Sequence, residues 1–243
     1  ARSDTRITLA GPLVSRPYVE MTVALMKRFG ADVRKSTGDT FEVAAGGYTA
    51  GDYSVEPDAS AASYFMAAAA ITGGRVTVEG LGTDSLQGDV AFAAALVQMG
   101  CSLEEEERGL TISGGALRGI EIDMNAISDT AQTLAVVAAF AEGPTRIHGI
   151  AHARVKETDR VAAMVCEFRR LGLEVDEHDD GLTIHPGPLQ AATIETYDDH
   201  RMAMSFALVG LKVPGIVVAD PGCTAKTYPG YFTDLEQLCG VSR

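Results

Sequence analysis

The stretch IHGIAHARVKETDRVAAMVCEFRRLGLEVDEHDDGLTIHPG, residues 147–187, decides the fold because the chain repeats its layout almost three times. Residues 78–115 read VEGLGTDSLQGDVAFAAALVQMGCSLEEEERGLTISGG, and both copies reach Gly-Leu-Thr-Ile near their ends. Residues 8–47 have the same layout. Self-similarity over this length indicates one supersecondary unit used several times.

Each unit reads as strand, helix, strand, helix, strand and strand. The clearest copy predicts strands over 120–124 and 145–148, helices over 130–143 and 158–171, and a hairpin of 173–175 with 182–184. The neighbouring copies predict first strands over 53–56 and 193–197. Asp58, Asp129 and Asp199 recur at intervals of about seventy residues, each just before a helix, as N-cap residues do.

The pattern predicts an α/β (α+β) fold of repeated βαβαββ units around a pseudo-threefold axis, with helices inside. The opening unit lacks its first strand and helix. We therefore expect residues 1–55 to be the tail of a preceding domain and residues 56–243 to be a domain of three units, with the boundary in 46–52. The chain starts without Met and enters a strand-like run directly, so we expect a piece of something longer.

Bulk composition excludes several classes of protein. The chain has 243 residues, of which 46% are hydrophobic and 22% charged, as in ordinary globular domains. A net charge of −13 argues against nucleic acid or an anionic membrane as partner. No apolar run approaches the roughly 20 residues of a membrane span. The four cysteines have no metal-ligand spacing and predict reduced thiols in a cytoplasmic protein.

Comparison of the repeats also identifies charged residues that the fold does not require. Arg154, Lys156, Glu157 and Arg160 stand at one helix entrance, whereas residues 81–99 of the sibling copy contain no Lys, Arg or His. Arg201 and Lys226 lie near further helix entrances. Helix N-termini and guanidinium groups both favour phosphate or carboxylate, so an anion site is expected where they converge. The alternative is a solvated charged face.

Two acids in this set are candidates for proton transfer. Asp129 and Glu157 lie among cations that lower the pKa of a carboxyl group, while burial raises it. The alternatives are a plain N-cap for Asp129 and a first-turn helix residue for Glu157. His200 precedes Arg201 and is a candidate contact for an anion, with a structural role as its alternative.

Five segments together resemble one known family, enolpyruvylshikimate-phosphate synthase (3-phosphoshikimate 1-carboxyvinyltransferase). They are LVSRPYVE at 13–20, EPDASAASYF at 56–65, VKETDR at 155–160, YDDHRMAM at 197–204 and CTAKTYP at 223–229. The resemblance covers essentially the whole chain. It implies the enolpyruvyl transferase fold (inverse α/β prism), in which two domains each contain three βαβαββ units, and this chain is similar to the C-terminal portion.

The resemblance also implies a reaction and a set of site residues. The family transfers the carboxyvinyl group of phosphoenolpyruvate to the 5-hydroxyl of shikimate 3-phosphate and releases phosphate, without metal or cofactor. The implied shikimate 3-phosphate contacts are Ser15, Tyr18, Asp129 and Lys156. The implied contacts to phosphoenolpyruvate, or to the inhibitor glyphosate, are Glu157, Arg160, His200, Arg201 and Lys226. The catalytic residues would be Asp129, Glu157 and Lys226.

The sequence departs from the family pattern at two places. His152 stands where many members have Asn, and the family's N-terminal signatures are absent. We therefore expect the N-terminal half of the enzyme as partner and no activity from this chain alone. Two alternatives remain: the sister enolpyruvyl transferase that acts on UDP-N-acetylglucosamine, and a non-catalytic half-protein.

Overall fold

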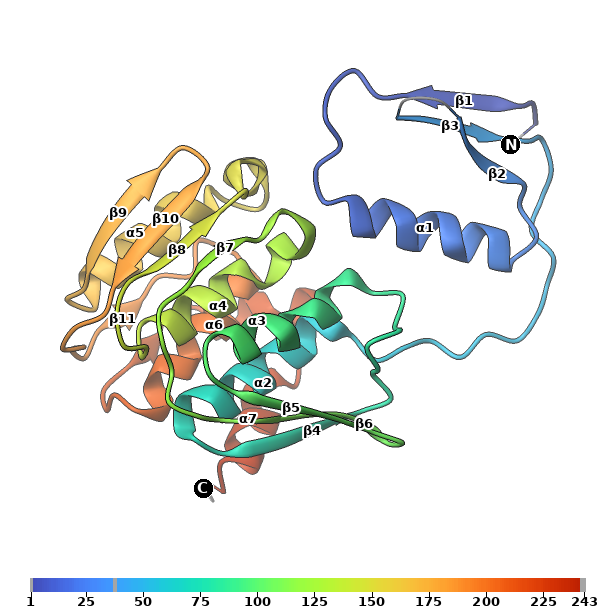
Figure 1. The fold of residues 1–243 in the computed structure, drawn as a ribbon. Coiled ribbons are helices and arrows are strands. Elements are labelled where there is room, and N and C mark those ends of the chain that lie inside the picture. The colour runs from blue at the N-terminus through green and yellow to red at the C-terminus, as the bar shows by residue number, and fades with distance from the viewer. Residues whose placement is uncertain (1, 37–38, 241–243) are drawn as a thin grey trace.

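The computed structural model describes residues 2–36 and 39–240, which form a small N-terminal unit and a larger body (Figure 1). Residues 1, 37–38 and 241–243, which fall within the two predicted domains, lie outside the described residues. The elements of the small unit are β1 (Thr5–Thr8), α1 (Arg16–Arg28), β2 (Val33–Ser36) and β3 (Thr40–Val43). Its strands pair antiparallel in the order β1-β3-β2.

The small unit has little core of its own. Helix α1 has no buried residue, and within residues 2–36 and 39–50 the buried side chains are Val33 and Thr40. The N-terminal end of α1 meets the body at Gly88, where an added Cβ would lie 2.4 Å from Cβ of Pro17. Glycine at position 88 therefore allows this close approach.

The predicted strand over 53–56 is wrong, because these residues form an extended connection between the two parts. Tyr-Ser-Val-Glu has alternating character, but a run of this kind becomes a strand only where a neighbouring strand shares its backbone hydrogen bonds. The described residues place no strand beside it. Glu56 instead accepts the backbone N–H of Leu86 through its side chain at 2.9 Å.

Three helices form the centre of the body, which confirms the predicted arrangement with helices inside. They are α2 (Ala59–Thr72), α4 (Ala131–Ala138) and α6 (His200–Ala207). Oγ1 of Thr133 on α4 lies 3.3 Å from Oγ of Ser63 on α2 and 3.2 Å from Oγ of Ser205 on α6. These short side chains lie about seventy residues apart and let the three helices approach one another closely.

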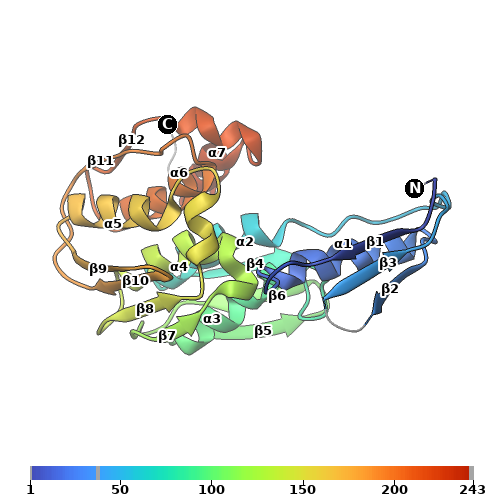
Figure 2. The same ribbon diagram turned by 90° about the horizontal axis from the view of Figure 1, so that it is seen from above.

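Sheets and further helices surround this centre (Figure 2). The sheets have the orders β4-β6-β5, β7-β8-β10-β9 and β11-β12. The strands are β4 (Arg75–Glu79), β5 (Ser102–Glu106), β6 (Gly109–Ser113), β7 (Glu121–Asp123), β8 (Thr145–His148), β9 (Glu174–His178), β10 (Gly181–His185), β11 (Thr193–Ile194) and β12 (Val217–Val218). The further helices are α3 (Phe92–Gln98), α5 (Arg160–Arg170) and α7 (Tyr231–Leu238).

The first residue of the repeated Gly-Leu-Thr-Ile must be glycine for the same structural reason in both copies. Gly109 and Gly181 begin β6 and β10, and each lies against the backbone of the neighbouring antiparallel strand, β4 or β8. An added Cβ would lie 2.0 Å from the carbonyl oxygen of Val78 in one copy and 2.0 Å from that of Ile147 in the other. A side chain at either position would therefore force two strands apart.

The middle unit contains all six predicted elements in the order β7, α4, β8, α5, β9 and β10. Its predicted hairpin is confirmed, since β9 and β10 pair antiparallel with Leu182 opposite Glu177. All four cysteines lie within the described residues, and none forms a disulfide. No helix in the described part of the chain is both long and apolar enough to cross a bilayer.

Candidate active site

A cavity of about 520 Å³ opens where the inner helices begin, and six charged side chains line it. They are Asp129, Lys156, Glu157, Arg160, Arg201 and Lys226. The sequence places these residues in four separate segments, and the fold brings them together. All six belong to the predicted site.

Asp129 is not the helix cap that its position in the repeat suggested. It lies in the 3-10 segment Asn125–Thr130, and the cap position of α4 falls on Thr130, which makes no side-chain cap bond. The Asp129 carboxylate instead accepts hydrogen bonds from Lys156, from Nη1 of Arg160 at 3.2 Å and from Nη2 of Arg201 at 2.8 Å. Three cations compete for the carboxylate more strongly than backbone N–H groups do.

The two sibling aspartates do cap their helices. Asp58 accepts the backbone N–H of Ala61 at 2.9 Å, and Asp199 accepts that of Arg201 at 2.8 Å. Asp199 also accepts Nε of Arg160 at 2.7 Å. Of the three equivalent acids, Asp58 is only a cap, Asp129 binds only side-chain cations, and Asp199 does both.

Arg160 connects the acids of the cavity. It is the first residue of α5 and is 1% exposed, so its charge must be paired inside the protein. Its Nη2 donates to Glu157 at 2.7 Å, while Nε reaches Asp199, which is 0% exposed. The alternative of a solvated charged face is therefore wrong for Arg160.

Glu157 and Lys226 form the outer rim of the cavity. Nζ of Lys226 donates to Glu157 at 2.7 Å, and the Lys226 side chain is 58% exposed. Because Lys226 has few fixed contacts, it is free to turn toward an anion in the cavity at small cost.

The cations determine the protonation of both acids. Burial by itself raises the pKa of Asp129, but Arg201, Lys156 and Arg160 outweigh it and hold the pKa at about 2. Glu157 follows the same logic, since burial raises its pKa and Lys226 and Arg160 lower it to about 2. Both carboxyl groups are therefore ionised at neutral pH.

These pKa values predict a loss of stability in acid. The pKa values in the unfolded chain are about 3.9 for Asp and about 4.3 for Glu. A carboxyl group with a lower pKa in the folded state stabilises the fold above its unfolded value, and this contribution disappears as the pH falls through the folded value. The free energy of unfolding in urea should therefore decrease from about pH 5 to about pH 2. The double variant D129N/E157Q should show a shallower decrease, and equal slopes would contradict the assignment.

Ser15 lies at the edge of the cavity, where the small unit meets the body. Its Oγ is 3.0 Å from Nε2 of His152 and 3.2 Å from Oγ of Ser128. Nζ of Lys156 donates to the same Ser128 hydroxyl at 3.2 Å. Burial and the Lys156 charge lower the pKa of His152, so its ring is neutral at pH 7. The predicted Ser15 and Lys156 thus share one hydrogen-bonded chain.

Tyr18 leads to a residue that sequence reasoning missed. Its hydroxyl donates to Asp89 at 2.7 Å, and Ser60 donates to the other oxygen of this carboxylate. Asp89 is 2% exposed, and burial raises its pKa while the two hydrogen bonds lower it. The available signal was a single acid in the otherwise uncharged entrance of α3. Tyr64 was also missed, although Nη1 of Arg201 lies 3.4 Å from its hydroxyl.

His200 is not among the side chains that line the cavity. It is 3% exposed, its Nδ1 has no hydrogen-bond partner among the described residues, and this atom lies 3.7 Å from Asp199. Burial and the neighbouring Arg201 lower its pKa, which favours the neutral ring. The predicted contact between His200 and an anion stays a prediction.

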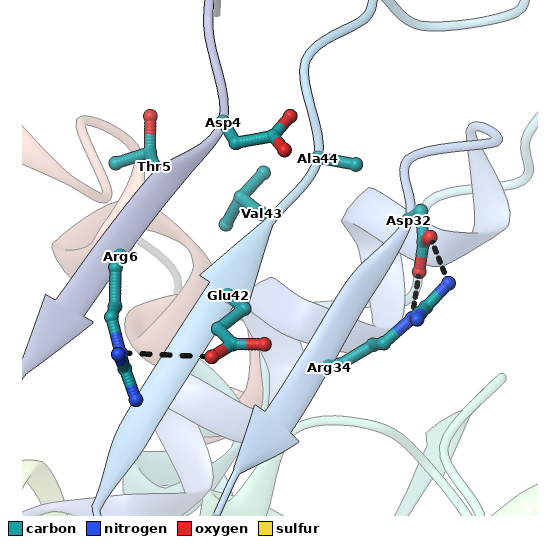
Figure 3. Close-up of a pocket in the computed structure, with 8 residues that line it drawn as sticks. All are labelled: Asp4, Thr5, Arg6, Asp32, Arg34, Glu42, Val43 and Ala44. Atoms are coloured by element: carbon teal, nitrogen blue, oxygen red, sulfur yellow. Dashed lines mark hydrogen bonds and ion pairs between the residues drawn. The ribbon is translucent and has the colours of Figure 1, made fainter.

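A second hollow lies on the small N-terminal unit and has a different character (Figure 3). Four of its five charged groups form two pairs: Arg34 with Asp32 at 2.6 Å and Arg6 with Glu42 at 3.6 Å. These side chains are between 46% and 74% exposed. Solvated pairs of this kind contribute little to stability. The fifth charged group, Asp4, accepts the backbone N–H of Ala45 at 2.7 Å.

Comparisons with known proteins agree with the geometry. A family model described as EPSP synthase (3-phosphoshikimate 1-carboxyvinyltransferase) matches residues 1–235. The chain is 53% identical over 240 residues to the 3-phosphoshikimate 1-carboxyvinyltransferase of Nostoc punctiforme, covering 98% of this chain and 56% of the relative. It is 50% identical over 242 residues to that of Edwardsiella ictaluri, with the same coverage. The chain thus spans about half the length of these curated relatives.

Solved structures give the same result for the fold. The EPSP synthase of Acinetobacter baumannii matches with a TM-score of 0.79 and 30% identity, covering 98% of this chain and 57% of that one. The enolpyruvyl transferase NikO of Streptomyces tendae matches with a TM-score of 0.71 and 23% identity, covering 98% and 56%. The second likeness concerns the fold alone.

Proposed function

The chain belongs to the EPSP synthase family, and from this premise we propose that its cavity catalyses carboxyvinyl transfer. The substrates are phosphoenolpyruvate and shikimate 3-phosphate, and the products are enolpyruvylshikimate phosphate and phosphate. One observation carries the proposal: four cations and two ionised acids from separate segments converge on one cavity of about 520 Å³.

The cations suit an anionic enol ester. Arg160 and Arg201 present guanidinium groups that bind carboxylate or phosphate through two hydrogen bonds at once. Lys226 lies at the exposed rim, where it adds a mobile positive charge. We assign these three residues, with Glu157, to phosphoenolpyruvate. His200 is assigned to the same subsite through its place beside Arg201.

The two acids divide the proton transfers between them. As the 5-hydroxyl oxygen bonds to C2 of phosphoenolpyruvate, Asp129 accepts the hydroxyl proton. C3 takes up a proton that the Glu157 carboxylate relays from the Lys226 ammonium group, with which it is hydrogen-bonded at 2.7 Å. The Glu157 carboxylate then takes a proton back from C3 of the tetrahedral intermediate as the bond from C2 to the phosphate oxygen breaks, and the hydroxyl proton held by Asp129 leaves with the phosphate. The surrounding cations stabilise the departing phosphate and the carboxylate in both steps. Lys226 bonds to Glu157, so it is placed to assist at C3.

The other substrate belongs at the junction with the small unit. Ser15 and Lys156 meet through the Ser128 hydroxyl and are assigned to the shikimate phosphate group. Tyr18 is held by Asp89 beside them and is assigned to the ring or phosphate of shikimate 3-phosphate. His152 supplies a neutral ring nitrogen at the same place.

We further propose that the N-terminal half of the enzyme completes the cleft, with residues 1–55 belonging to the preceding domain and 56–243 to the three-unit domain. Support comes from the small unit, whose helix α1 has no buried residue, and from the coverage of about half of each relative. Four cysteines without disulfides suit a reducing, cytoplasmic setting.

Phosphate release tests the function directly. The chain is incubated with both substrates alone, and again after mixing with an N-terminal fragment that carries the missing part of the relatives. We expect release from the mixture and none from the chain alone. Turnover by the chain alone would refute the need for the second half. Release only with UDP-N-acetylglucosamine as acceptor would favour the sister transferase, and no release at all would favour a non-catalytic protein.

A further inference from the structure

The turn that leads into α6 has an unusual backbone. Tyr197 and Asp198 have φ values of 56° and 54°, and the N–H of Asp199 donates to the carbonyl of Thr196 at 2.9 Å. Two consecutive central residues with positive φ are typical of a type I′ turn, which favours Gly, Asn and Asp. Tyrosine is therefore unexpected at position 197. A strained backbone at such a residue indicates that its side chain has a role elsewhere in the molecule.

The hydroxyl of Tyr197 is anchored by a buried acid. It donates to Oε1 of Glu167 at 2.7 Å, while Oε2 of Glu167 accepts the backbone N–H of Glu195 at 3.1 Å. Glu167 is 0% exposed, whereas Tyr197 is 37% exposed. Burial and hydrogen bonds with Cys166 and Glu167 raise the pKa of Tyr197, so the hydroxyl keeps the proton it donates.

The same helix holds the turn at a second point. Glu167 follows Arg160 by seven residues on α5, so both side chains lie on one face of the helix. Arg160 donates to Asp199 at 2.7 Å and Glu167 accepts from Tyr197. These two contacts hold residues 197–199 of the turn against α5.

We propose that Glu167 acts through the Tyr197 hydroxyl as a positioning residue for the anion site. It holds the strained turn so that Asp199 faces both Arg160 and the backbone N–H of Arg201. Neither Glu167 nor Tyr197 lines the cavity. This role rests on the proposed function. Glu167, a buried acid outside the cavity, would keep the guanidinium groups of Arg160 and Arg201 aligned.

Two variants of Tyr197 separate positioning from simple structural support. Y197F removes the hydroxyl and keeps the ring, and Y197N removes the hydroxyl while supplying a residue that suits the turn. In the chain combined with its N-terminal part, we expect the KM for phosphoenolpyruvate to rise about tenfold in both, as expected for one lost hydrogen bond to a charged group. The KM for shikimate 3-phosphate should stay within about twofold. The Tm of Y197N should fall less than that of Y197F, because asparagine adopts the turn backbone more readily.

Glu195 provides the matched control, since its side chain is 53% exposed and it directly precedes the turn. E195Q should leave both KM values unchanged, whereas E167Q should reproduce the change of Y197F. An unchanged KM for phosphoenolpyruvate in Y197F and E167Q, with normal turnover in the unsubstituted protein, would overturn the positioning role and leave the proposed function standing.

Calorimetry with inorganic phosphate gives a readout that does not need turnover. The unsubstituted chain should bind phosphate about tenfold more tightly than Y197F. Equal affinities would overturn the positioning role by themselves. Absence of both phosphate binding and turnover in the unsubstituted protein would overturn the proposed function together with this inference.

Discussion

Replacing Asp129 with asparagine is expected to lower kcat by about 10² to 10⁴, the contribution of one group in general acid–base catalysis. Asparagine keeps the shape of the side chain and one oxygen for Lys156 and Arg160, but it has no charge and does not accept a proton from the attacking hydroxyl. The loss should therefore appear in kcat and leave the fold intact. Phosphate release by the chain combined with its N-terminal part measures it.

The pKa of about 2 does not prevent Asp129 from acting as a base. That value reflects pairing of the carboxylate with Arg201, Lys156 and Arg160. A multiply anionic substrate competes for the same cations, and as it takes them the pKa of the carboxyl group rises toward the range in which a base is effective. The two carboxylates therefore pair with these cations until the substrate anions arrive.

The repeat supplies a matched control for this experiment. Asp58 occupies the sibling position about seventy residues earlier and caps α2 through the N–H of Ala61. Asparagine is about as good a cap as aspartate, so D58N should leave kcat and stability nearly unchanged. Retention of more than about a tenth of kcat in D129N would remove Asp129 from the proton transfer.

Replacing Arg160 with methionine should have the largest effect on stability, about 3–5 kcal/mol in the free energy of unfolding. The reason is Asp199, whose side chain is 0% exposed and which loses the guanidinium group at 2.7 Å. An uncompensated buried charge is far more costly than a missing contact. Urea unfolding of the chain at pH 7 measures the difference.

Lys226 is the matched control for Arg160, since it pairs with an acid of the same cavity but is 58% exposed. K226M should change the free energy of unfolding by about 1 kcal/mol or less, as exposed ion pairs do. Similar losses in R160M and K226M would show that burial of Arg160 does not matter, contrary to the structure. K226M should still weaken turnover, because the rim cation is lost.

Much of the fold was predictable because its causes are local. The helix of residues 158–171 follows from a periodic apolar face, and the hairpin of β9 and β10 from a turn at Gly181. The predicted strand over 53–56 was wrong, because a strand needs a neighbouring strand to share its backbone hydrogen bonds and the local sequence does not show whether one is present. Lys156, Glu157 and Arg160 were found because they carry charge where a sibling repeat carries none, and Arg201 and Lys226 because they lie near further helix entrances. Asp89 and Glu167 escaped because each is a single acid in a segment without other signals.

The amino-acid sequence alone determined the repeated unit, the placement of helices and strands within it, and the charged residues at the helix entrances. Periodicity and capping act over a few residues, so both can be recognised in the sequence. Only the tertiary structure decided which of three equivalent aspartates is a cap and which binds cations. Asp129 pairs with Lys156, Arg160 and Arg201, residues 27 to 72 positions away, and helix packing alone sets those distances.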